Sequence, residues 1–149
     1  MLTVVIDARA NAQDLPALLS QLTAGAVDGL VRQVLIVAAP DQPGVDELCE
    51  DMGAEAHATL PSAGRAARSE RLMVLPAALR LRDGWIRAIA DHLARGGGDA
   101  VVVGLETGGF FARPPFGLLV QRHLVEQGVD RADLKALRRG LSAGARRVG

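Results

Sequence analysis

The 149-residue chain contains very few aromatic side chains. It has no tyrosine, one tryptophan and three phenylalanines, so aromatic residues make up 3% of the sequence. Proteins that hold single-stranded nucleic acid usually stack its bases on aromatic side chains, and this composition argues against such a surface. The core has to be built mainly from aliphatic residues, in keeping with a hydrophobic content of 49%.

Cysteine is almost absent as well. Cys49 is the only one, which excludes an internal disulfide. It falls on the apolar side of a predicted helix, which favours a small buried side chain over a nucleophile. No apolar run approaches the ~20 residues of a membrane-spanning helix, and Asp7 and Arg9 interrupt any signal-like run near the start. We therefore expect a soluble, cytoplasmic protein without a transmembrane segment.

The chain carries no net charge, because 17 basic and 17 acidic residues cancel. Without a global field, we expect no nucleic-acid partner. The charges are nevertheless segregated, with six acids and no base in residues 41–56 and six bases and one acid in residues 131–149. Two solvated helix faces explain this pattern. Complementary surfaces that meet in a homo-oligomer are the alternative.

Apolar runs alternate with helical patterns along the whole chain. Strands are predicted at residues 2–6, 34–37, 54–58, 72–75 and 100–105. Helices are predicted at residues 12–23, 45–52, 85–94, 117–127 and 132–139, with a polar connection at 61–70 and a loop at 107–117. This alternation indicates a single α/β domain over residues 1–149, with a mostly parallel sheet and helices on both faces.

Several segments resemble family 2 glycosyltransferases with the GT-A fold. Residues 2–11 are similar to that family's opening strand, and residues 14–19 (Asp-Leu-Pro-Ala-Leu-Leu) follow its Asn-Leu-Pro-Ala-Leu-Leu pattern. Asp83-Gly84-Trp85 is similar to the Pro-Gly-Trp that follows the family's metal motif. The resemblance covers most of the chain. It implies a Rossmann-like architecture of the nucleotide-diphospho-sugar transferase kind, with Trp85 buried at the start of its helix.

The residues that carry this family's chemistry are replaced. Its Asp-Ala-Asp motif, which carries a divalent metal and the sugar diphosphate, falls on residues 76–78, which read Pro-Ala-Ala. Neither Pro nor Ala supplies a side-chain oxygen for a metal. The acid after the second strand is replaced by Ala-Ala-Pro at 38–40, and Asp130 or Asp133 stands nearest to the family's catalytic carboxylate. The resemblance implies a shortened, inactive member without metal, cofactor or catalytic residues, acting as a binding or self-associating module.

Two groups of polar residues are candidates for binding a nucleotide or nucleotide sugar. Asp7 and Arg9 follow the first strand, at the edge where open α/β sheets bind ligands, although an internal ion pair also explains them. Arg65, Arg68 and Arg71 recur at spacing three, so on a helix they would form one cationic stripe that could hold a diphosphate. A solvated connector is the alternative for these arginines.

The alternative function is a metal-independent glycosyltransferase with a nucleotide-sugar donor. In it, the three arginines replace the cation, and Asp7, Asp41 or Asp130 supplies the base. His57, His92 and His123 lack the paired spacing of metal ligands, and we expect them at the surface or at helix ends.

The loop at residues 107–117 is the most unusual segment of the chain. It contains all three phenylalanines, Phe110, Phe111 and Phe116, together with two prolines. Clustered aromatic side chains supply much of the energy of protein interfaces. We therefore expect this loop to contact a protein partner or a second copy of the chain in a homodimer, unless it covers a shortened side of the domain.

Overall fold

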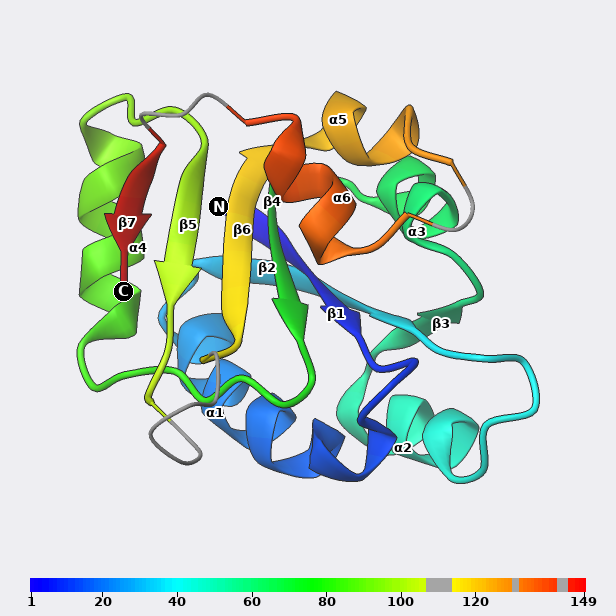
Figure 1. Ribbon diagram of the computed structural model, residues 1–149. Helices are drawn as coiled ribbons and strands as arrows, with labels where there is room; N and C mark the ends of the chain where they lie inside the picture. The colour runs from blue at the N-terminus through cyan, green and yellow to red at the C-terminus, as the bar shows by residue number, and fades with distance from the viewer. Residues whose placement is uncertain (107–113, 130–131, 142–144) are drawn as a thin grey trace.

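The computed structural model describes residues 1–106, 114–129, 132–141 and 145–149. One seven-stranded sheet runs through the molecule in the order β3-β2-β1-β4-β6-β5-β7 (Figure 1). Only β6 runs antiparallel to its neighbours, β4 and β5. The mostly parallel α/β sheet predicted from the sequence is therefore confirmed. The strands are β1 (Leu2–Asp7), β2 (Val31–Val37), β3 (Glu55–His57), β4 (Arg71–Pro76), β5 (Ala100–Val103), β6 (Phe116–Gln121) and β7 (Arg146–Val148).

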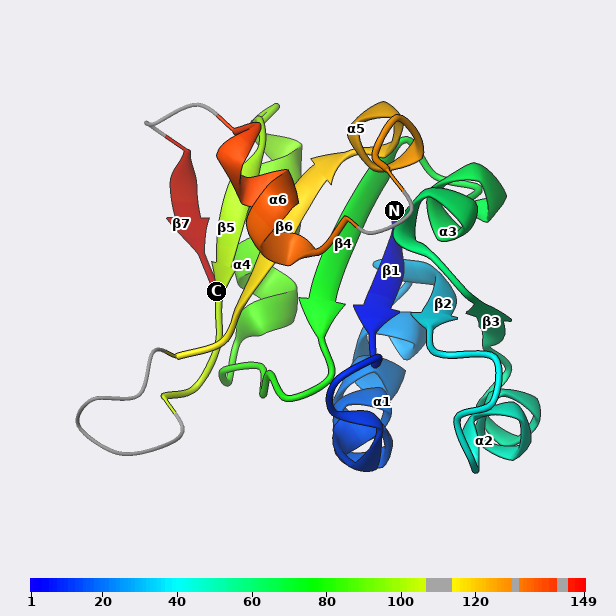
Figure 2. The same cartoon turned by 45° about the vertical axis from the view of Figure 1, so that its right-hand side comes forward.

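Helices cover both faces of this sheet, as Figures 1 and 2 show. Successive side chains of a strand point to opposite faces. In β1, Val4 and Ile6 join the hydrophobic cluster beneath one set of helices, while Val5 joins the cluster beneath the other. The first set is α1 (Leu15–Val27, preceded by the 3₁₀ turn η1, Ala12–Asp14), α2 (Val45–Met52) and α4 (Trp85–Ala94). The second set is α3 (Leu60–Ala66), α5 (Arg122–Glu126) and α6 (Leu134–Arg139).

Two predictions about buried side chains are confirmed. Trp85 is 6% exposed at the start of α4. Its ring lies against Gly25 of α1, where a Cβ atom would come within 2.6 Å of Trp85 Cη2. Cys49 is also buried, and burial, with the charge of Asp46 in support, raises the pKa of its thiol. Such a thiol is inert at neutral pH.

The prediction of one helix over residues 117–127 is wrong. The first part of this segment is the strand β6, and the chain becomes helical only at Arg122, where α5 begins. β6 lies between β4 and β5 and is buried on both faces, so its side chains show no alternation of apolar and polar residues. A short, continuous apolar run of this kind cannot be distinguished from a buried helix by periodicity.

Two further elements were not predicted. The connection at 61–70 contains α3, whose first turn is stabilised by Pro61 and by Thr59, since the Ser62 N–H donates to Thr59 Oγ1 at 3.2 Å. β7 adds an edge strand next to β5. None of the helices in the described ranges combines the length and the hydropathy needed to cross a bilayer.

Candidate functional site

The order of the strands reverses between β1 and β4. Chain order runs outward from β1 to β2 and β3 on one side, while β4 lies on the other side of β1. Open α/β sheets bind ligands at the carboxyl ends of the strands that flank such a switch point. β1 ends at Asp7 and β4 at Pro76, and these two residues are paired in the register of the sheet. The candidate site therefore lies at this edge.

Asp7 and Arg9 form the ion pair expected from the sequence. Arg9 donates from Nε to Asp7 Oδ1 at 2.9 Å and from Nη2 to Asp7 Oδ2 at 2.8 Å. Its Nη2 also donates to the Ala132 carbonyl at 2.9 Å, which joins the β1 loop to the segment before α6. The hydrogen bonds that Arg9 donates to Asp7 raise the pKa of Arg9 against the effect of its partial burial, and the charges of Asp7 and Asp133 add to the rise. The Asp7 carboxylate is thus occupied by a permanent cation.

The segment after β4 is held by Arg80 and not by a metal-binding motif. Arg80 Nη1 donates to the carbonyls of Ala77 and Leu79 at 3.0 and 2.9 Å, and its Nη2 lies 3.3 Å from Asp14 Oδ1. Residues 76–78 themselves offer no side-chain oxygen. Within the described ranges no group of three His, Cys, Asp or Glu side chains could hold a metal ion. The donor set at the end of β4 does not fit a divalent cation.

A cleft of about 1340 Å³ opens at this edge of the sheet. It is larger than the roughly 300–1,000 Å³ of typical ligand pockets. Its described walls come from the ends of β1 and β4, the start of β6, α6 and β7. Among the described residues, five bases and three acids line it: Arg82, Lys135, Arg138, Arg139 and Arg147, with Asp7, Glu106 and Asp133.

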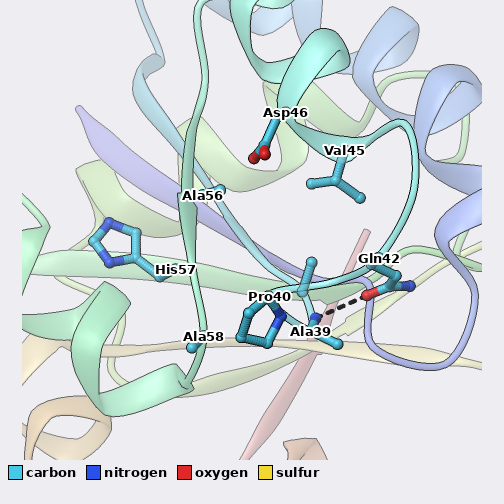
Figure 3. Close-up of a pocket in the computed structure, with 9 residues that line it drawn as sticks. Ala39, Pro40, Gln42, Val45, Asp46, Ala56, His57 and Ala58 are labelled. Carbon is cyan, nitrogen blue, oxygen red and sulfur yellow. Dashed lines mark hydrogen bonds between the residues drawn. The ribbon is translucent and has the colours of Figure 1, made fainter.

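A smaller pocket of about 160 Å³ lies at the carboxyl ends of β2 and β3 (Figure 3). Gln42 closes the loop after β2, because its Oε1 accepts from the Ala39 N–H at 2.8 Å and its Nε2 donates to the Ala8 carbonyl at 3.0 Å. Asp46 and His57 are the other polar side chains at this pocket. Its remaining walls are small and apolar: Ala38, Ala39, Pro40, Val45, Ala56 and Ala58.

The structure places the arginines of residues 65–71 at the opposite edge of the sheet. α3 ends at Ala66, so Arg68 and Arg71 lie outside it and the three side chains do not share one helical face. The Arg68 N–H donates to Gln33 Oε1, near the start of β2. Arg71 begins β4, roughly 16 Å along the strand from Pro76. Its guanidinium donates to two carbonyls of the loop after α4, at 3.0 and 2.8 Å.

The other candidate carboxylates are dispersed. Asp41 is exposed in the loop after β2 and lines neither pocket. Asp133 lines the large cleft and caps α6, where its Oδ1 accepts from the Ala136 N–H at 2.9 Å. Asp130 lies outside the described residues. Glu106, which was not singled out in the sequence, is an exposed carboxylate in the wall of the cleft.

The histidines take up unrelated positions. His92 is buried in the last turn of α4 and donates from Nε2 to the Gly98 carbonyl at 2.8 Å. His57 Nδ1 lies 3.0 Å from Ser62 Oγ, and His123 is exposed on α5. They share no site.

The phenylalanine loop is described only in part. Phe116 begins β6 and is half-buried, with the Arg138 guanidinium 4.7 Å from its ring centroid. Phe110 and Phe111 lie outside the described residues.

The cations of the cleft are the functional candidates that sequence reasoning missed. Four of them, Lys135, Arg138, Arg139 and Arg147, belong to the basic segment at residues 131–149, whose composition predicts a solvated or complementary surface and not a ligand site, and Arg82 lies outside that segment. The spacing of Lys135, Arg138 and Arg139 already places these three side chains on one face of a helix. The position of that face over the cleft depends on how α6 packs, and this could not be predicted from spacing.

Comparison with known proteins identifies the architecture. No protein-family model and no curated protein sequence matches the chain. Among solved structures, it is similar to glucosyl-3-phosphoglycerate synthase from Mycobacterium tuberculosis, with a TM-score of 0.61 and 13% identity over 83% of this chain and 57% of that one. The chain is also similar to mannosyl-3-phosphoglycerate synthase from Rubrobacter xylanophilus, with a TM-score of 0.62 and 17% identity over 99% of this chain and 65% of that one. A nucleotidyl transferase from Methanothermobacter is similar as well, with a TM-score of 0.58 and 16% identity over 100% of this chain and 86% of that one.

Identities this low establish the fold alone. The chain spans 57% and 65% of the lengths of the two phosphoglycerate synthases, so it matches part of each. Glycosyltransferases and nucleotidyltransferases both occur among the similar structures. The chain therefore has the GT-A, Rossmann-like architecture of nucleotide-diphospho-sugar transferases and nucleotidyltransferases.

Proposed function

We propose that this chain is a degenerate relative of family 2 glycosyltransferases that binds a nucleotide-type ligand in its large cleft and transfers no sugar. The observation that carries the proposal is the end of β4. There, residues 76–78 present Pro and Ala side chains at the switch point, and Arg80 binds the backbone that follows. A transferase that depends on a divalent metal needs oxygen ligands at the diphosphate. Removing them leaves the cleft and its charge while removing that chemistry.

Two of the three described cleft carboxylates, Asp7 and Asp133, support the same proposal. General base catalysis needs a carboxylate that is free to accept a proton from the acceptor hydroxyl. Asp7 is bound by Arg9 through two hydrogen bonds, and one oxygen of Asp133 is used to cap α6. A similar solved structure, the synthase from M. tuberculosis, holds Mn²⁺ and uridine diphosphate. From that structure we carry over to this chain only the binding of a nucleotide, and neither the metal nor the transfer reaction.

Two measurements test this function. Calorimetric titration of uridine diphosphate into the protein should show binding in EDTA that Mn²⁺ does not strengthen, after the heat of Mn²⁺ binding to free uridine diphosphate is subtracted, because no residue at the end of β4 couples metal to ligand. Uridine diphosphate glucose should remain intact with and without 3-phosphoglycerate as acceptor. Release of uridine diphosphate above the rate without protein would contradict the proposal.

A metal-independent glycosyltransferase remains the second candidate, and the cations of the cleft favour it. Positive side chains can neutralise a leaving diphosphate in place of a metal. Arg65 and Arg71 lie at the far edge of the sheet, so Arg138 and Arg139 would take their role. Glu106 would be the base, as an exposed carboxylate in the cleft wall. Turnover that is lost in Glu106→Gln, with binding retained, would establish this candidate.

Self-association stays a proposal, and the fold changes its expected geometry. The acids of α2 and β3 and the bases of β7 lie at opposite ends of the sheet, since β3 and β7 are its two edge strands. Attraction between these edges alone would join copies head to tail. A symmetric dimer needs another contact, for which we propose the phenylalanine loop. Sedimentation at tens of micromolar should show a dimer that weakens in Phe110→Ser/Phe111→Ser. A monomer at all concentrations would remove this proposal.

A further inference from the structure

The basic side chains of α6 face the large cleft together. Lys135, Arg138 and Arg139 have the i, i+3, i+4 spacing that gathers side chains on one side of a helix. Leu134 and Leu137 pack on the hydrophobic cluster beneath the helix. All three basic residues line the cleft, as expected if the apolar side of α6 faces the sheet and the basic side faces the opening.

Arg147 joins them from β7. Val148 packs on the cluster beneath α1, α2 and α4, so its neighbour Arg147 points to the other face of the sheet, where α6 lies. The register agrees, because Arg147 pairs with Val101, whose side chain belongs to the cluster beneath α6. Figures 1 and 2 show β7 at the edge of the sheet and α6 in front of β6, and β5 lies between β7 and β6 in the sheet. Two elements thus bring four cations to one wall.

No acid in the described part of the chain pairs with these cations. Among the described residues, none of the four has a carboxylate within 4.0 Å. Two of the three described acids of the cleft are engaged elsewhere, Asp7 with Arg9 and Asp133 with the first turn of α6. Stacking on the Phe116 ring positions the Arg138 guanidinium at the wall. Like charges on one helix face repel each other, and an anion between them relieves this repulsion.

We propose that the wall formed by Lys135, Arg138, Arg139 and Arg147 binds the diphosphate group of the ligand without a metal. Guanidinium groups match phosphate oxygens with paired hydrogen bonds, and three arginines and a lysine can meet several oxygens of one diphosphate. The inference rests on the proposed function and deepens it. It moves the diphosphate away from residues 76–78, which offer it nothing, to the α6–β7 wall of the same cleft.

The test is calorimetric titration of inorganic pyrophosphate, uridine diphosphate and uridine in EDTA at low ionic strength. Arg139→Gln/Arg147→Gln removes two charges from the wall. Arg65→Gln/Arg68→Gln removes two charges from exposed arginines at the opposite edge and serves as the matched variant. We expect the first pair to weaken pyrophosphate and uridine diphosphate at least tenfold, and the second less than threefold. Circular dichroism should show both variants folded, since all four side chains are exposed.

Three outcomes would overturn the inference: no pyrophosphate binding by the wild type at millimolar concentration, equal weakening in both variants, or weakening by the Arg65/Arg68 pair alone. Turnover of uridine diphosphate glucose, measured in parallel, reports on the proposed function by itself. Turnover with wall-dependent pyrophosphate binding would refute the absence of transfer and leave the site standing. Absence of both turnover and wall-dependent binding would refute the site and leave the non-catalytic function standing.

Discussion

Because Gly25 lies in close contact with Trp85, we expect Gly25→Ala to lower the stability of the protein. A second substitution, Trp85→Phe, should remove most of this effect. Gly25 is buried inside α1, where glycine costs about 1 kcal/mol relative to alanine. A Cβ atom there would lie 2.6 Å from Trp85 Cη2 and 2.8 Å from Val31 Cγ2. Overpacking of a filled core typically costs about 1–3 kcal/mol. After the gain in helix propensity, Gly25→Ala should lower the free energy of unfolding by about 1 kcal/mol.

The same substitution should be nearly neutral in the Trp85→Phe background. Phenylalanine lacks the outer ring that carries Cη2 and Cζ2, two of the three atoms nearest to the added methyl group. The contact with Val31 remains, so the methyl group is accommodated only in part. We expect a coupling free energy of about 1 kcal/mol between the two positions, above the ~0.5 kcal/mol within which independent substitutions add.

Urea unfolding followed by far-UV circular dichroism measures this cycle, because two of its four proteins lack tryptophan. Ala24→Gly is the control, since Ala24 is the exposed neighbour on the same helix. It should cost about 1 kcal/mol through helix propensity alone, equally in both backgrounds. If Gly25→Ala has the same effect with Trp85 as with Phe at that position, the packing argument is refuted.

Two further predictions concern the half-buried Gln21 amide and the buried Cys49 thiol. Gln21 accepts from the Leu81 N–H at 2.8 Å and donates to the Leu81 carbonyl at 3.0 Å, so Gln21→Ala should lower the free energy of unfolding in urea by about 1–3 kcal/mol, with partial recovery in Gln21→Glu. Burial raises the pKa of the Cys49 thiol. The protonated thiol therefore contributes its full share to the free energy of unfolding below the pKa of the unfolded state, and this share is lost as pH rises through the pKa of the folded state. The wild type should therefore lose more stability than Cys49→Ala between about pH 7.5 and pH 9.5 in urea titrations, and equal losses would contradict this.

Elements with a clear local signal could be predicted from the sequence. The run of buried residues in β1 and the apolar stripe of α4 between Gly84 and Arg95 lie close to their predicted bounds. β6 could not be predicted as a strand, because a strand buried on both faces has no alternating pattern of apolar and polar residues. β7 could not either, since its three residues form a strand only by pairing with β5, more than forty residues earlier in the chain.

The sequence predicted which edge of the sheet carries the candidate site, but not the charged side chains that line the cleft there. The position of Asp7 after the first strand indicated the carboxyl edge, and its ion pair with Arg9 followed from their proximity in sequence. The charge of the cleft depends on which face α6 presents and on which side of β7 Arg147 emerges. Both are set by tertiary packing. For the same reason, spacing alone suggested a stripe for Arg65 and Arg68, whereas the chain leaves the helix between them.

Calorimetric titration of Mn²⁺ with uridine diphosphate present can show whether the end of β4 binds a metal, when the wild type is compared with Pro76→Asp/Ala78→Asp and with uridine diphosphate alone. These substitutions place two carboxylates at the end of β4, beside the switch point of the sheet. We expect no heat from the wild type beyond that of Mn²⁺ binding to uridine diphosphate alone, and additional saturable, stoichiometric binding for the variant. A stoichiometric Mn²⁺ site of micromolar affinity in the wild type would contradict this expectation.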